Sequence, residues 1–173
     1  VPVQGPQDLK KARHAAMEER AHAQIPAVDA NIILRFLTND DPLKAEACAA
    51  LLERKNAMGQ VWLPDLVLAD TIWTLEKFYR VSKARIAELT APIVSLRGLH
   101  CAKKDVVFLA LRLYARHNVD WTDAFVAAQL LSQNESSIYS YDRDFDRIPG
   151  IVRENPEPRR EPYGAGAAFG RAG

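Results

Sequence analysis

Two aspartates directly follow short segments with strand character, a position from which a carboxylate can do chemistry. Asp29 comes after Ile25–Val28, and Asp142 comes after Ile138–Tyr141. Each segment predicts a short strand, so each carboxylate is expected at a strand's carboxyl end, where open α/β sheets bind their ligands. For Asp29 taken alone, a role as a helix cap or in an Asx turn is an open alternative.

A third aspartate, Asp70, lies in a segment with helical periodicity. It shares one face of the predicted helix with Leu66, Trp73 and Lys77. Because this helix is apolar around much of its circumference, we expect Asp70 to be partly buried. A partly buried carboxylate needs a partner, which is either a structural contact or a cation.

The fourth aspartate, Asp123, heads an apolar stripe near the end of the chain. The stripe is predicted to be buried and consists of Val126, Ala127, Leu130 and Leu131. Asp123 should therefore point toward the core or a cleft beside it. The alternative is that it only complements the dipole of its helix.

The elements that must position these acids alternate between strands and helices. We expect strands at residues 25–28, 61–63, 99–102, 138–141 and 151–152, and helices beginning near residues 31, 42, 64, 82, 105 and 122. The predicted helix caps are Asp41 (with Pro42 after it), Ser82, Asp105 and Thr122. This alternation predicts a parallel sheet with all strand carboxyl ends at one edge, to which Asp70 and Asp123 can approach.

Several carboxylates in one crevice repel each other, which indicates either a bound hard cation or raised pKa values. Soft or nitrogen ligands are not suggested, since Cys48 and Cys101 form no CxxC motif and the four histidines show no zinc-site spacing. Mg²⁺ or Mn²⁺ is therefore the expected metal. Such an ion can activate water for attack on a phosphodiester.

The composition sets limits on the class of protein. A chain of 173 residues suits one main domain, and a net charge of +1 means that nucleic acid would have to bind through a local patch. The N-terminus has no apolar signal region and no segment reaches membrane-spanning length, so we expect a cytoplasmic protein without a membrane partner.

Four motifs occur in order along the chain: VDANIILRFLTNDDP, LADTIWTLEKFY, VDWTDAFVAAQLL and SYDRDFDRIPG. Together they resemble the PIN domain, specifically the VapC-type toxins of bacterial toxin–antitoxin pairs, over roughly residues 25–152. The resemblance implies an α/β fold, a three-layer α/β/α sandwich with a central, mainly parallel sheet. It also implies an endoribonuclease that depends on Mg²⁺ or Mn²⁺ and leaves a 5′-phosphate and a 3′-hydroxyl.

On this basis three segments are expected. Residues 1–24 form a polar N-terminal extension, in which Met17 is a candidate for the natural translation start. Residues 25–153 form the PIN-like nuclease domain. Residues 154–173 lack periodicity and are predicted to be a disordered tail.

The resemblance carries the family's catalytic acids onto Asp29, Asp70, Asp123 and Asp142. It implies that Asp29, Asp123 and Asp142 hold the metal. The second family acid is most often Glu, so the shorter Asp70 would act directly or through a water. Asn31 is expected to orient the first carboxylate or a substrate phosphate, and Asp144 to assist at the fourth position.

Arginines and tryptophans are the candidates for RNA contact. Guanidinium groups bind phosphate in a bidentate manner, which makes Arg35, Arg143 and Arg147 candidates for steering RNA; salt bridges to adjacent acids are the alternative. The three tryptophans at 62, 73 and 121 could stack on bases, although tryptophan is more often a core residue.

The leading hypothesis is a toxin ribonuclease that is held inactive by an antitoxin protein and forms a homodimer. Two alternatives stay open. One is a catalytically silent PIN-like module that binds RNA or protein, for which the Asp70 substitution is the sequence support. The other is a housekeeping RNA-processing nuclease.

Overall fold

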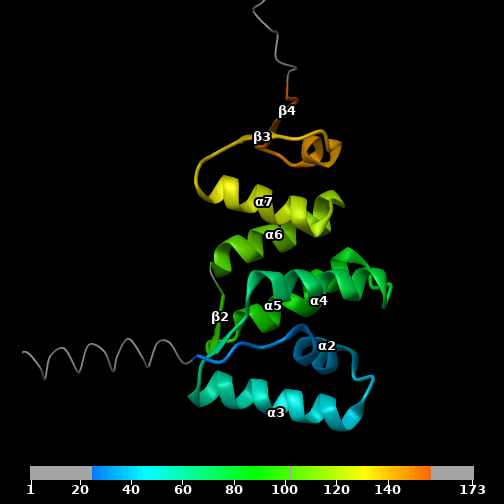
Figure 1. Cartoon of the computed structure of the whole chain (residues 1–173), viewed down its shortest axis with the longest axis vertical. Helices are drawn as coiled ribbons and strands as arrows, with labels where there is room; N and C mark the ends of the chain where they lie inside the picture. The colour runs from blue at the N-terminus through cyan, green and yellow to red at the C-terminus, as the bar shows by residue number, and fades with distance from the viewer. Residues whose placement is uncertain (1–24, 102, 157–173) are drawn as a thin grey trace, which may run out of the picture.

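The computed structural model describes residues 25–101 and 103–156, and the predicted N-terminal extension and most of the predicted tail lie outside them. Figure 1 shows the helices stacked along the long axis of the molecule, with α3 at one end and β3 and β4 at the other, beyond α7. In chain order they are α2 (Ala30–Thr38), α3 (Pro42–Met58), β1 (Val61–Trp62), α4 (Asp65–Lys77), α5 (Lys83–Ser95), β2 (Leu99–His100), α6 (Lys104–His117), α7 (Trp121–Ser132), β3 (Ser137–Tyr139), the 3₁₀ turn η1 (Arg143–Arg147) and β4 (Val152–Glu154).

The strands are short, and all of their pairings are parallel. β1 pairs with β2, and Ala27 adds a single bridge to Trp62 on the other side of β1. β3 pairs with β4, and Glu154, the first residue of the predicted tail, is still part of this ladder. Within the described ranges no pairing joins the two sheets. The α/β alternation is as predicted, and one continuous central sheet stays a prediction.

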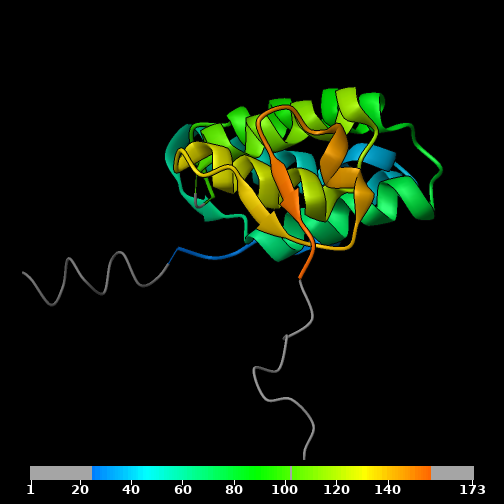
Figure 2. The same ribbon diagram turned by 90° about the horizontal axis from the view of Figure 1, so that it is seen from above.

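The helices supply most of the core. α4 packs against α2, α5 and α7, and α6 packs between α5 and α7. Seen from above, β3 and β4 lie over the outer face of this helical stack (Figure 2). The fully buried side chains Ile72, Ile86 and Tyr114 come from α4, α5 and α6, so three successive helices share one interior. In the described part of the chain, no helix has the length and apolar character needed to cross a membrane.

Two of the four predicted caps are confirmed and two are wrong. Asp41 accepts a hydrogen bond from the Lys44 amide at the start of α3, and Ser82 accepts one from Arg85 at the start of α5. α6 and α7 begin earlier than Asp105 and Thr122 would allow, because the last extended residues before them are Lys103 and Asp120. Asp105 therefore lies inside the first turn of α6, where its charge complements the helix dipole.

α7 uses small residues to approach its neighbours. Its buried residues are Trp121, Ala124, Ala127 and Ala128. Of the stripe predicted from the sequence, only Ala127 is fully buried, while Val126, Leu130 and Leu131 are partly buried. The buried face is rotated because alanine permits the close contact between α7 and α6, with the larger side chains flanking it.

Candidate metal centre

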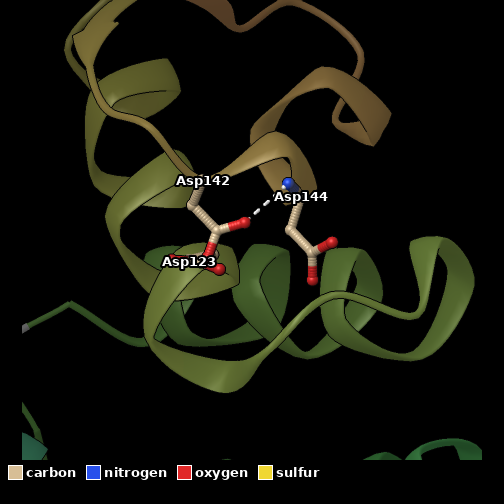
Figure 3. A group of neighbouring side chains, drawn as sticks. All are labelled: Asp123, Asp142 and Asp144. Atoms are coloured by element: carbon tan, nitrogen blue, oxygen red, sulfur yellow. Dashed lines mark hydrogen bonds between the residues drawn. The ribbon is translucent and has the colours of Figure 1, made fainter.

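Three carboxylates from two separate segments meet at the start of α7. Asp123, Asp142 and Asp144 each offer one carboxylate oxygen, and these oxygens all lie within 4.8 Å of one another (Figure 3). Asp123 is in the first turn of α7, whereas Asp142 and Asp144 lie in the turn after β3. α7 packs directly against η1, which brings the two segments together.

Hydrogen bonds within the turn fix Asp142 and Asp144 relative to each other. One Asp142 oxygen accepts a hydrogen bond from the Asp144 amide at 2.9 Å and caps η1 (Figure 3). The Asp142 amide donates to the hydroxyl of Ser140 at 3.0 Å. These bonds leave carboxylate oxygens of both aspartates facing Asp123.

Arg153 on β4 fixes the same turn from the other side. Its guanidinium donates to both carboxylate oxygens of Asp146, at 2.9 and 3.1 Å, and to the carbonyl of Ser140 at 3.1 Å. This contact holds the pKa of Asp146 below its ordinary value. Asp146 is therefore occupied by a structural ion pair, which explains why it does not join the three-carboxylate group.

The electrostatics of the group favour a cation. The pKa of Asp123 is raised to about 6, first by burial and then by the negative charges of Asp142, Asp120 and Asp144. Lys83 opposes this effect only in part. Mg²⁺ and Mn²⁺ prefer carboxylate oxygens as ligands, and their positive charge offsets the repulsion between clustered carboxylates. The residues present therefore fit a hard divalent ion.

Asp29 occupies the N-cap position of α2, but its side chain makes no capping hydrogen bond. It instead accepts a hydrogen bond from the side-chain amide of Asn31 at 3.0 Å, so Asn31 orients this carboxylate. Asp29 is exposed and is not part of the three-carboxylate group. α4 packs against both α2 and α7, and so connects the helix that follows Asp29 to the helix that carries Asp123.

The expected partial burial of Asp70 is wrong. Asp70 is exposed on α4, as are the other residues of its face, Leu66, Trp73 and Lys77. The opposite face of the helix carries the buried residues Leu68, Ala69, Thr71, Ile72 and Leu75. An apolar circumference did not indicate burial here because the neighbouring helices cover only one side of α4.

Two of the three candidate arginines form salt bridges with nearby acids. Arg35 donates to Asp40 at 2.8 Å. Arg147 lies 3.2 Å from Asp144, a member of the carboxylate group, and donates to a backbone carbonyl at 3.4 Å. Arg143 is exposed in the same turn. Two arginines therefore border the carboxylate group on its η1 side.

The tryptophans divide between core and surface. Trp121 is buried, whereas Trp62 and Trp73 are 49% and 41% exposed. Sequence reasoning missed Lys83 and Arg153, because their partners lie on other elements and leave no signal in the local pattern.

Comparison with known proteins identifies the family. The PIN domain family matches residues 27–151, a span that contains all four predicted acids. The chain belongs to the PIN domain family. This PIN domain is also similar to the VapC ribonuclease of Aquifex aeolicus (strain VF5), with 21% identity over 130 residues that cover 75% of this chain and 95% of the relative. The resemblance carried by the four sequence motifs is thereby confirmed.

Proposed function

We propose that this PIN domain is a metal-dependent endoribonuclease and the toxin of a toxin–antitoxin pair. The observation that carries the proposal is the convergence of Asp123, Asp142 and Asp144 in a protein of this family. The similarity to a protein named VapC ribonuclease supports RNA as the substrate. An antitoxin partner, a homodimer, a cytoplasmic location and the three-layer sandwich belong to the same proposal through the family.

In this proposal Asp123 and Asp142 hold Mg²⁺ or Mn²⁺ and Asp144 assists them. When bound, such a metal supplies an activated water and stabilises the charge that develops at the phosphate. Asp29, whose carboxylate is oriented by the Asn31 side chain, would be a further ligand, as the family resemblance implies. Asp70 is short and exposed, so we assign it a water-mediated contact.

The arginines beside the carboxylate group would bind phosphates of the RNA backbone. Arg147 is paired with Asp144 in the free protein. If Asp144 turned to a metal held by the group, the Arg147 guanidinium would be free to bind a substrate phosphate in a bidentate manner. Arg143 is exposed in the same turn and would contact a further phosphate. Arg35, the third candidate, lies in the last turn of α2 and is paired with Asp40.

A catalytically silent PIN module that binds RNA or protein is the second candidate. The observation in its favour is that Asp29 and Asp70 lie outside the three-carboxylate group. A housekeeping nuclease shares the proposed chemistry and differs only in its biological target.

The test is cleavage of a mixed RNA panel with Mg²⁺, Mn²⁺ or EDTA. The variants are Asp123→Asn, Asp29→Asn and the control Glu46→Gln, an exposed acid on α3. We expect metal-dependent cleavage that falls by about 100-fold or more in both aspartate variants and is retained in the control. Metal binding without cleavage would favour the silent module. Growth arrest on expression of the wild type, relieved by Asp123→Asn, would separate a toxin from a housekeeping nuclease.

A further inference from the structure

A lysine that is nearly enclosed lies behind the carboxylate group. The side chain of Lys83, at the first residue of α5, is 16% exposed. Its ammonium donates to the carbonyl of Val119 at 2.7 Å and lies 3.5 Å from the carboxylate of Asp120. Val119 and Asp120 form the link from α6 into α7, whose first turn carries Asp123. Lys83 therefore holds the backbone immediately before α7, the helix whose first turn carries Asp123.

Two other helices hold the ammonium in place. Lys83 Nζ lies 3.9 Å from a carboxylate oxygen of Glu76 on α4 and 5.0 Å from the centre of the Tyr114 ring on α6. The Tyr114 hydroxyl donates to the other Glu76 oxygen at 2.8 Å. Burial and Glu76 together raise the pKa of Tyr114, so its hydroxyl keeps its proton and stays a donor. One cation thus connects α4, α5 and α6 to the start of α7.

The link has other contacts, since Val119 is fully buried and Arg147 donates to the Asn118 carbonyl at 3.4 Å, but the cap of α7 adds no side-chain bond of its own. α6 ends at Asn118 in a left-handed conformation, with φ 54°. The side chain of Asp120, which occupies the N-cap position of α7, makes no capping hydrogen bond. The ammonium therefore supplies a side-chain tether to a segment whose own cap supplies none. Metal ligands have to be held within about 0.5 Å of their productive positions, which supporting contacts of this kind provide.

We propose that Lys83 is a positioning residue of the metal site, which fixes the Val119–Asp120 link and thereby the direction of Asp123. Glu76 and Tyr114 fix Lys83 in turn. The inference rests on the proposed function, because it takes the three-carboxylate group to be the metal site.

The direction in which metal affinity changes when Lys83 is replaced separates a positioning role from a purely electrostatic one. A lysine near a cation site repels the ion, so a residue that acted only through its charge would weaken metal binding, and its removal would tighten it. A residue that positions a ligand does the opposite, since its removal scatters Asp123 over several orientations. The proposal therefore predicts weaker binding once the repelling charge has been removed.

The experiment measures Mn²⁺ affinity of the full chain by electron paramagnetic resonance, without RNA, and hydrogen exchange at residues 119–124. The variants are Lys83→Met, Lys83→Arg and the control Lys77→Met. Lys77 contacts the same Glu76 carboxylate at 3.3 Å from the surface of α4. Asp123→Asn identifies which bound ion belongs to this site.

We expect Lys83→Met to weaken Mn²⁺ binding about tenfold and to speed exchange at residues 119–124. Lys83→Arg should recover part of the affinity, and Lys77→Met should stay within about twofold of the wild type, as exposed ion pairs generally do. Mn²⁺ binding by Lys83→Met that is as tight as, or tighter than, that of the wild type would overturn the proposal, whatever happens to exchange.

Tyr114→Phe provides a second test if Lys83→Met fails to fold. It removes only the hydroxyl that orients Glu76 and leaves the net charge unchanged. We expect about fivefold weaker Mn²⁺ binding, the factor that one ordinary hydrogen bond represents, and unchanged binding would refute the positioning role. A wild type that binds Mn²⁺ through Asp123 but does not cut RNA would refute the proposed ribonuclease alone. A wild type that binds no Mn²⁺ there would overturn both.

Discussion

Asp123→Asn should make the metal-free protein more stable, although it removes a residue central to the proposed function. The pKa of Asp123 is raised from 3.8 to about 6, and a difference of this size corresponds to about 3 kcal/mol. Because Asp123 is only partly buried, solvent screening reduces the figure to about 1–2 kcal/mol. The amide has nearly the same shape and no charge, so the variant should gain this amount at pH 7.5.

The pH dependence follows from the direction of the shift. Between about pH 4 and pH 6 the folded protein keeps a proton that the unfolded chain has already released. The stability of the wild type therefore falls as pH rises through this window and shows no further loss from this group above it. Asp123→Asn has no such group, so its advantage should be small near pH 4 and complete above pH 6.

Urea unfolding in EDTA at several pH values measures this difference. The midpoints and slopes of Asp123→Asn are compared with those of the wild type and of Glu46→Gln, in which an exposed acid on α3 is neutralised. A variant that is less stable than the wild type at pH 7.5, or a difference that does not change with pH, would refute the repulsion argument.

Three further predictions concern the same site and its support. Mg²⁺ or Mn²⁺ at 100 times its dissociation constant should stabilise the wild type by about 2.7 kcal/mol, whereas Asp123→Asn should show no such gain in a thermal melt. Arg153→Met should lower the melting temperature and weaken Mn²⁺ binding, because it frees the turn that Arg153 holds through Asp146. An unchanged Mn²⁺ affinity would mean that this contact contributes to the stability of the protein and not to metal binding. In urea unfolding, Trp121→Ala should cost about 3–5 kcal/mol, since Trp121 is buried, whereas the half-exposed Trp73 should tolerate alanine with a much smaller loss.

The sequence by itself determined much of the local structure. Apolar spacing located the helices, and the caps Asp41 and Ser82 were predictable because a capping side chain bonds to an amide only three residues away. The order of the four motifs predicted the family, which the match over residues 27–151 bears out. The placement of Asp29 and Asp142 after strand-like segments also followed from residues within a few positions of each.

Only the tertiary structure decided which charges meet. Asp123 and Asp142 lie on different elements, and it is the packing of α7 against η1 that brings them together with Asp144. Periodicity could not show that Asp70 faces outward, since the covered side of α4 depends on which helices pack against it. Lys83 and the carbonyl of Val119 are 36 positions apart, so no pattern of neighbouring residues could pair them. The spacing of residues in the sequence relates positions about one turn of helix apart, whereas charge and burial depend on which elements pack together. For that reason the contacts that hold this site appear only in the folded chain.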